Sequence, residues 1–151
     1  MAKGLPDYME NFPYGFKEKK KACVIKKSDT KRFIYPHRAA YSDLNWLYVS
    51  TDRLFFAVYT LAPGSTFAPS DVHAGDEVYY ILSGAVTLLN PETGQVVELK
   101  EGDGVLMPEG TWHKAYNFEK TQARIVAIIA PTAWPPEGLP EEGYPGDMQV
   151  L

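Results

Sequence analysis

Short apolar segments separated by Gly and Pro are the sequence feature that most limits how this chain can fold. They recur through residues 54–130, and none continues with the 3.6-residue periodicity of a long amphipathic helix. Segments of this length that are rich in aromatic and β-branched residues are typical of strands. Many short strands with Gly and Pro between them predict an all-β fold, an antiparallel jelly roll or closed barrel.

The turn residues indicate where individual strands begin and end. Residues 54–61 end at Ala62-Pro63-Gly64 and are expected to form a strand buried on both faces. Residues 85–89 and 95–99 flank Asn90-Pro91-Glu92-Thr93-Gly94, where Pro presets φ and Gly accepts a positive φ, so a hairpin is predicted. Further strands are expected over residues 78–82, over residues 105–107, around His113 and over residues 124–130.

The two ends of the chain carry weaker patterns. Residues 22–25 and 45–49 are the only strand candidates near the N-terminus, the first as an edge strand. Five prolines lie between residues 131 and 151. Proline has no N–H to donate to a sheet, so this Pro-rich tail is expected to wrap irregularly over the surface.

The length and composition allow one sizeable core. The chain has 151 residues, of which 45% are hydrophobic. We therefore expect a single domain over residues 1–151, with a core barrel at about 55–131, an N-terminal extension at 1–54 and a C-terminal tail at 132–151.

The cysteine content and the N-terminus favour a cytoplasmic protein. Cys23 is the only cysteine and cannot form an internal disulfide, and no apolar stretch follows Met1-Ala2-Lys3-Gly4. No run approaches the roughly 18 apolar residues of a membrane-spanning helix, so no membrane partner is expected.

Charge is distributed unevenly along the chain. Residues 1–38 hold 10 of the 15 Lys and Arg but only 4 of the 19 Asp and Glu. Such a basic segment can contact nucleic acid or anionic ligands, but it is more often a solvated face or an edge strand protected from aggregation. With a net charge of -4 we expect no nucleic-acid partner. Alternatively, the segment packs over the barrel of a second subunit.

Two segments carry side chains that can bind a metal ion. Asp71 and His73 share one face of an extended chain, Gly75 lets the backbone bend, and Glu77 opens the next strand, so it can return to the same interior face. His113 comes from a later strand. Imidazole nitrogen and carboxylate oxygen suit zinc, iron, nickel and manganese. As an alternative, these residue types also occur in ordinary turns and on surfaces.

His37 is the third histidine of the chain. It follows Pro36 in the basic N-terminal stretch, and we expect it to be a surface or packing residue rather than a ligand.

Two motifs of the sequence resemble those of the cupins. The second conserved motif of that family is matched at every fixed position by Gly102, Pro108, Gly110, His113 and Asn117. The first motif is matched by Gly64, Asp71, His73, Glu77 and Gly84, with one extra residue after Gly64 and with Asp71 where the family usually has its first His. The two motifs cover about residues 63–117, and the flanking strands extend the likeness to about 55–131. The resemblance implies a double-sheet jelly roll and a metal site, but it is nearly silent on substrate.

Asp71 has two alternative roles in such a site. As a fourth ligand beside His73, Glu77 and His113 it would have to bring the backbone close to the ion, because its side chain is shorter than that of His. If it does not reach, the other three residues form a three-ligand face that leaves positions for water and substrate. The run from His73 to Glu77 also resembles that of the phosphonate-epoxidising iron cupins, which use such a face. An unligated Asp71 beside a cation would stay ionised and could accept a proton from substrate.

Counting every second residue predicts which side chains face the barrel interior. From Glu77 the count places Tyr79 and Ile81 inside, and from His113 it places Ala115 and Asn117 inside. Tyr79 is therefore a candidate for a catalytic role beside Asp71. We expect Asn117 to bond to the backbone in a turn.

Other candidates for the walls of a ligand pocket are Phe56, Val58 and Met107, with Met107 on the same face as Val105. The alternative for Tyr79, Met107 and Phe56 is plain packing in the core, because aromatic and Met side chains usually pack.

The first functional hypothesis is a small metalloenzyme of the dioxygenase or oxidase type that acts on an oxygen-bearing organic substrate. It would hold one divalent ion per chain, Fe²⁺ in first place and Mn²⁺, Ni²⁺ or Zn²⁺ otherwise. The alternatives are a non-redox decarboxylase, lyase or isomerase, and a non-catalytic cupin that captures a small acid or sugar. A homodimer is expected from the resemblance and because exposed strand edges need covering.

Overall fold

The computed structural model describes residues 12–13, 21–34, 44–51, 53–67, 70–133 and 149–150. Within these ranges the regular structure consists of ten strands and one short 3-10 helix, η2 (Lys27–Asp29). Every strand pair is antiparallel, and the strands form two sheets. The predicted all-β, antiparallel double-sheet fold is confirmed. Within the described ranges, no helix has the length and apolar character needed to cross a membrane.

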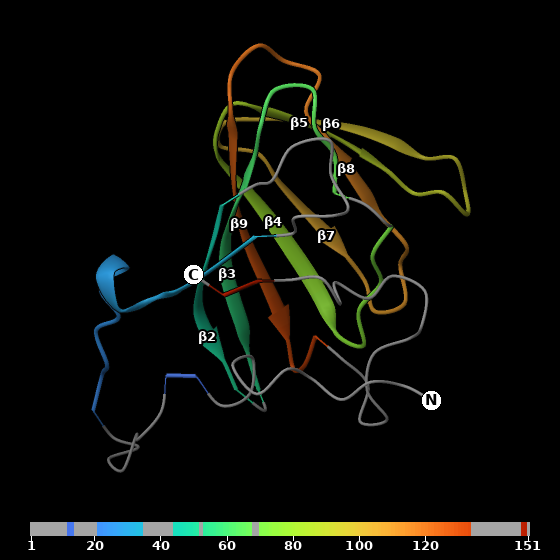
Figure 1. The fold of residues 1–151 in the computed structure, drawn as a ribbon. Helices are drawn as coiled ribbons and strands as arrows, with labels where there is room; N and C mark the ends of the chain where they lie inside the picture. Colours follow the sequence, from blue (N-terminus) through green and yellow to red (C-terminus); the bar gives the residue numbers. More distant parts are fainter. Residues whose placement is uncertain are drawn as a thin grey trace.

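The larger sheet has seven strands, and those of them that Figure 1 labels lie side by side. In spatial order they are β10 (Gln149–Val150), β1 (Lys31–Ile34), β2 (Asn45–Ser50), β3 (Phe55–Leu61), β9 (Ala123–Ala130), β4 (Asp76–Ser83) and β7 (Gly104–Met107). Strands β1 and β2 come from the N-terminal extension, and β10 comes from the end of the Pro-rich tail. The core strands β3, β9 and β4 therefore lie in the middle of this sheet.

The smaller sheet has the order β6 (Val96–Lys100), β5 (Ala85–Leu89) and β8 (Lys114–Tyr116). The chain ahead of β4 pairs with the outer edge of β8. Phe67 N donates to Ala115 O at 3.0 Å, and the backbones of Asp71 and His113 exchange two hydrogen bonds of 2.8 and 2.9 Å. This pairing places the two metal-binding motifs side by side, although they lie far apart in the sequence.

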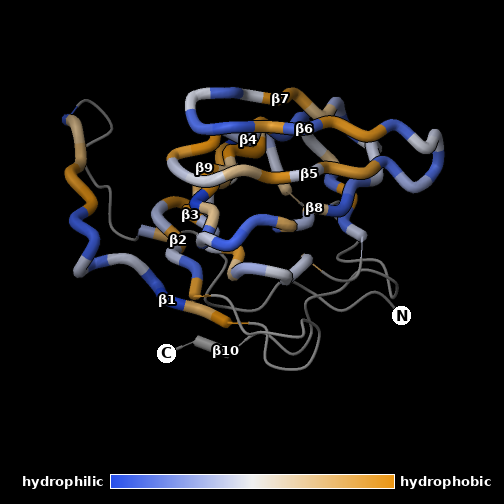
Figure 2. The backbone as a smooth tube through the Cα atoms, turned by 90° about the horizontal axis from the view of Figure 1, so that it is seen from above, coloured by the Kyte–Doolittle hydropathy of each residue, from blue (hydrophilic) through white to orange (hydrophobic). Residues whose placement is uncertain are grey.

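The predicted hairpin forms between β5 and β6, with Leu88 opposite Val97. Gly94 in the connecting turn has a φ of 75°, a left-handed conformation that favours glycine. Asn90 also holds the turn, because its side-chain oxygen accepts hydrogen bonds from the backbone of Glu92 and Thr93. In Figure 2 this turn is hydrophilic, whereas the strands that it joins carry hydrophobic residues.

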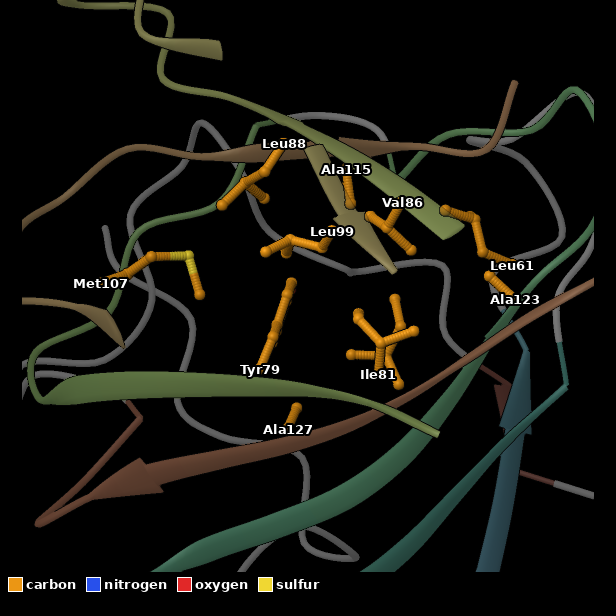
Figure 3. Close-up of a cluster of buried hydrophobic side chains, with 11 residues drawn as sticks. Leu61, Tyr79, Ile81, Val86, Leu88, Leu99, Met107, Ala115, Ala123 and Ala127 are labelled. Carbon is orange, nitrogen blue, oxygen red and sulfur yellow. The ribbon is translucent and has the colours of Figure 1, made fainter. Parts of the chain in front are cut away.

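The core lies between the inner faces of the two sheets (Figure 3). Tyr79 and Ile81 of β4 are 4% and 0% exposed, whereas their neighbour Tyr80 is 45% exposed. The inner side chains of β4 pack against Val86 and Leu88 of β5. The alternation predicted from Glu77 is thus confirmed, as is the burial of Ala115, Asn117 and Met107.

The structure bears out the expected role of Asn117. Its Nδ2 donates to the carbonyl oxygens of Leu61 and Thr121 at 2.8 Å each, and its side-chain oxygen accepts from the backbone N–H of Glu119. Asn117 therefore connects the end of β3 to the turn before β9. It is a structural residue of the second motif.

Strand β3 differs from the expectation for Phe56 and Val58. The side chains that reach the inner cores are those of Phe55, Ala57 and Leu61. Phe56 lies on the opposite face, where its ring stacks on Tyr48 at 4.9 Å between centroids. The prediction that Phe56 and Val58 line a pocket is wrong, because a strand buried on both faces has no polar alternation to show which set points inward.

Four expectations concern the end regions of the chain. The structure has no strand over residues 22–25, whereas residues 45–49 lie in β2 as predicted. The last part of the tail is not irregular, because Gln149 and Val150 pair with β1 as β10. These two residues follow the last proline and keep their N–H donors. His37 lies outside the described residues.

Candidate metal centre

Three of the predicted ligands come together at one end of the barrel interior. His73 lies in the loop before β4, Glu77 is the second residue of β4, and His113 directly precedes β8. Their ligand atoms all lie within 4.8 Å of one another. All three residues are buried, with 8%, 2% and 3% of their surface exposed. The backbone pairing of the two motifs therefore produces a compact His–Glu–His cluster.

Both imidazole rings face the same carboxylate oxygen. His73 Nε2 lies 3.2 Å from Glu77 Oε2, and His113 Nε2 lies 2.9 Å from the same oxygen. The ring centroids are 5.4 Å apart and the ring planes are inclined by 48°. One oxygen and two nitrogens thus converge on a common point, with the donor types that suit a divalent transition metal.

The other nitrogen of each imidazole ring faces a backbone carbonyl. His73 Nδ1 is 3.3 Å from Ala133 O, and His113 Nδ1 is 3.0 Å from Thr111 O. An Nδ1–H that donates to a carbonyl leaves Nε2 as the nitrogen with a lone pair for a metal ion. The sequence contained no sign of these two contacts, because a carbonyl acceptor belongs to every residue type.

The residues present fit a divalent cation. Glu77 Oε2 and His113 Nε2 are buried, and neither makes a well-aligned hydrogen bond within the part of the chain that the structure describes. Buried polar atoms that make no aligned hydrogen bond are costly and uncommon in folded proteins. A metal ion bound by His73, Glu77 and His113 would satisfy both atoms. The cluster therefore has the ligand set, the burial and the unmet bonding capacity of a metal site.

The electrostatics of the cluster reflect its burial and its mixed charges. Burial opposes protonation of His73, but the carboxylates of Asp71 and Glu77 outweigh it and raise the pKa of His73 to about 9. Burial likewise opposes protonation of His113, and Glu77 again raises its pKa. Burial opposes ionisation of Glu77, but the two histidines lower its pKa to about 2. Without a metal ion, the cluster is thus held together by charge attraction.

Asp71 lies at the rim of the cluster. Its Oδ2 is 3.6 Å from His73 Nε2, and its side chain is 39% exposed. Its Oδ1 accepts a hydrogen bond from the backbone of Val72 at 2.9 Å. Asp71 therefore shares a face with His73, as predicted, but it is outside the buried group of three ligands. Its position suits contact with water or substrate more than it suits a fourth bond to the ion.

Tyr79 links the cluster to the apolar core. Its ring meets the His113 ring edge to face, with 5.9 Å between centroids and 89° between planes. Its other neighbours are apolar side chains such as Met107 and Leu88. Tyr79 therefore packs between His113 and the apolar core.

Comparison with known proteins agrees with this fold. The two facing antiparallel sheets and the inward His–Glu–His cluster define a jelly-roll protein with a candidate metal centre. Residues 57–129 match the family model described as a cupin domain. These residues form a cupin domain. No curated protein matches the chain.

Several solved structures share the fold. A predicted oxalate decarboxylase from Thermotoga maritima is 24% identical, with 72% of this chain and 99% of that chain covered and a TM-score of 0.59. The polyketide cyclase RemF from Streptomyces resistomycificus is 20% identical, with 82% and 91% covered and a TM-score of 0.62. A cupin domain from Bordetella pertussis is 22% identical, with 60% and 94% covered and a TM-score of 0.52. At these identities the likeness shows the fold alone.

Proposed function

We propose that this protein is a mononuclear metal-dependent enzyme of the dioxygenase or oxidase type, with one divalent ion held by His73, Glu77 and His113. The observation that carries the proposal is the convergence of three buried ligand atoms within 4.8 Å. Two imidazoles and one carboxylate on one side of an ion are the arrangement of non-haem iron(II) oxygenases, so Fe²⁺ is the favoured ion.

A bound ion would supply Lewis-acid and templating chemistry for an oxygen-bearing substrate. Glu77 would contribute the one buried negative charge of the ligand set, and the two histidines would bind as neutral imidazoles. Asp71, partly exposed at the rim, is placed to accept a proton from a substrate hydroxyl. Tyr79 forms a wall on the side of His113.

The surroundings of the cluster favour a substrate with little charge. None of the described buried residues is Lys or Arg. Among these buried residues no side chain can compensate a negative substrate, and Glu77 and Asp71 would already offset much of the charge of a bound ion. We therefore expect a neutral or singly charged molecule with an apolar body and one or two oxygen donors.

A non-redox reaction is the second candidate function. It is favoured by two structures with the same fold, one described as a predicted oxalate decarboxylase and the other as a polyketide cyclase. In that case Mn²⁺, Ni²⁺ or Zn²⁺ would bind to the same three residues, and the protein would act as a decarboxylase, lyase or isomerase. A cupin that only binds a small molecule would retain its ligand after metal removal.

Anaerobic reconstitution with Fe²⁺ tests the proposal against these alternatives. A panel of catechol, acetylacetone and a 2-oxo acid is added, with oxalate as the dianionic comparison, and the absorption spectrum and O₂ uptake are recorded. We expect a substrate-dependent spectral change and stoichiometric O₂ consumption for a member of the first group. Turnover that needs no O₂ and persists with Mn²⁺ or Zn²⁺ would contradict oxygenase chemistry.

The variant His113→Ala, assayed beside Tyr79→Phe, ties that activity to the cluster. His113→Ala removes a ligand and should abolish both the spectral change and O₂ uptake. Tyr79→Phe keeps the ring that meets His113 and should still bind Fe²⁺. Activity that survives His113→Ala would contradict the assignment of the site.

The expected homodimer remains a proposal. Leu106 of β7, Val78 of β4 and Ile128 of β9 lie opposite one another on the outer face of the larger sheet, with exposures of 59%, 39% and 38%. An apolar row beside the edge strand β7 is suited to cover by a second copy of the chain. Light scattering should report twice the chain mass at micromolar concentration, and a monomer there would contradict the proposal.

A further inference from the structure

The chain that leaves β9 lies directly against the loop that carries His73. We call residues 130–133 the β9 extension. Ala133 O accepts a hydrogen bond from the backbone N–H of Ala74 at 3.2 Å and faces His73 Nδ1 at 3.3 Å. Asp76 lies opposite Ala130 in the ladder between β4 and β9. The β9 extension therefore runs alongside residues 73–76 and presents one carbonyl to the ring of a ligand.

Gly75 makes this close approach possible. A Cβ atom at residue 75 would lie 2.5 Å from Ala130 O and 2.7 Å from Thr132 O. Real Cβ atoms do not come this close to backbone oxygens, so any side chain would displace the β9 extension or the His73 loop. Glycine is needed here because it has no side chain. Its backbone conformation is not the reason, since its φ is not in the left-handed region.

We propose that Gly75 and Ala133 are positioning residues of the metal centre. Ala133 holds the His73 ring so that Nε2 faces Glu77, and Gly75 allows Ala133 to reach that ring. The inference rests on the proposed metal-binding function of His73, Glu77 and His113. Carbonyl partners of metal-binding imidazoles fix the ring and its tautomer, and losing them typically costs about 10- to 100-fold in metal affinity.

The two histidines differ in how their rings are held. The carbonyl that faces His113 belongs to Thr111, two residues away in the same loop. The carbonyl that faces His73 comes from a segment 60 residues further along the chain. The orientation of His73 thus depends on the packing of the β9 extension, and a change at Gly75 should act on one ligand and spare the other.

Two other glycines provide matched controls. A Cβ at Gly84 would lie 2.8 Å from Gln122 O, a similar clash at the opposite end of β4 from Glu77, and the left-handed φ of 78° at Gly84 adds backbone strain to it. A Cβ at Gly104 would meet only Tyr79 O at 3.5 Å, an ordinary contact. Gly84→Ala therefore reports on strain away from the site, and Gly104→Ala reports on the glycine-to-alanine change alone.

The test compares Gly75→Ala, Gly84→Ala and Gly104→Ala with the unsubstituted protein. Zn²⁺ affinity is measured by competition with a chromophoric chelator, the absorption spectrum of the Co²⁺ form reports ligand geometry, and thermal unfolding without metal reports stability. We expect Gly75→Ala to weaken Zn²⁺ binding by about 10- to 100-fold and to alter the Co²⁺ spectrum. Gly84→Ala should lower the unfolding temperature but leave the affinity and the spectrum of the folded protein unchanged.

Three results would overturn the inference. Gly75→Ala with unchanged affinity and spectrum would show that the β9 extension does not position His73, and an equal loss in Gly84→Ala would show a general effect of strain. If the unsubstituted protein binds neither Zn²⁺ nor Co²⁺, the proposed metal site fails and the inference fails with it. The first two results leave the metal site itself intact, so the two kinds of failure are distinguishable.

A measurement on the unsubstituted protein covers the case in which Gly75→Ala does not fold. In the Zn²⁺ form, nitrogen–proton correlation spectra of the histidine side chains should show His73 with a proton on Nδ1 that exchanges slowly with solvent. A proton on Nε2, or an Nδ1 proton that exchanges as fast as that of an exposed histidine, would contradict the contact with Ala133.

Discussion

The two ends of the barrel interior differ in what their side chains do, although strand β4 runs through both. At its start, Glu77 faces two histidines, and further along the same face Ile81 packs among Val86, Leu88 and other apolar side chains (Figure 3). Tyr79 lies between them, in contact with His113 and with the apolar core. We infer that the apolar end stabilises the fold and that the polar end is free to carry chemistry.

The largest expected effect is the loss of metal binding on substitution of His113 by Ala. The variant leaves two ligands at the polar end, so Zn²⁺ or Fe²⁺ affinity should fall by more than the roughly 100-fold that is lost when a hydrogen-bond partner of a metal ligand is removed. Competition with a chelator measures the affinity, and circular dichroism checks that the β-structure remains. Tightly bound metal in a folded His113→Ala variant would contradict the assignment of metal binding to the polar end.

Ile81→Ala should show the opposite behaviour. Ile81 is completely buried at the apolar end, so removal of its side chain leaves a cavity and should lower the free energy of unfolding by about 2–5 kcal/mol. Denaturant unfolding of the metal-free protein measures this change. Metal affinity of the folded variant should stay within about twofold. A large loss of affinity would show that the two ends are not independent.

The pH dependence of stability should distinguish the metal-free and metal-bound forms. In the metal-free form, the pKa of His73 is raised from 6.5 to about 9, so its stabilising effect is complete below 6.5 and disappears as the pH rises to about 9. The pKa of Glu77 is lowered from 4.5 to about 2, so its effect is present above 4.5 and disappears as the pH falls to about 2. The cluster should therefore stabilise the metal-free form most between pH 4.5 and 6.5.

Metal binding needs both imidazoles without their protons, so the stability maximum of the metal-bound form should lie at higher pH. Urea unfolding across pH 4 to 9, with and without Zn²⁺, measures both curves. Identical curves for the two forms would contradict the assignment of His73 and Glu77 as ligands.

Tyr79→Phe should have the smallest effect on stability, because Tyr79 lies where the two ends meet. The substitution keeps the ring that packs against His113 and removes only the hydroxyl, so the change in unfolding free energy should be about 1 kcal/mol. If Tyr79 contacts substrate as proposed, turnover falls while Fe²⁺ affinity is unchanged. Unaltered turnover would reduce Tyr79 to a packing residue.

The sequence predicted those features that depend on local rules. The period of two along β4 placed Glu77, Tyr79 and Ile81 on one face, and Asn90 to Gly94 marked the hairpin. The spacing of the two motifs also indicated the ligands that the structure brings together.

Features that depend on distant backbone contacts could not be predicted in this way. Gly75 suggested a bend, but only the structure shows that the backbone of Ala130 and Thr132 lies against it. The pairing of β10 with β1 was missed for the same reason, because two residues after a Pro-rich segment carry no periodic signal. Phe56 was misplaced because apolar residues occupy both faces of β3.

Elemental analysis of protein purified without added metal or chelator tests the central claim most directly. If His73, Glu77 and His113 form a metal centre, the protein should contain close to one divalent transition metal ion per chain, and the folded His113→Ala variant should contain almost none. A folded protein that is free of metal and does not take up Fe²⁺, Mn²⁺, Ni²⁺ or Zn²⁺ on dialysis would contradict the account.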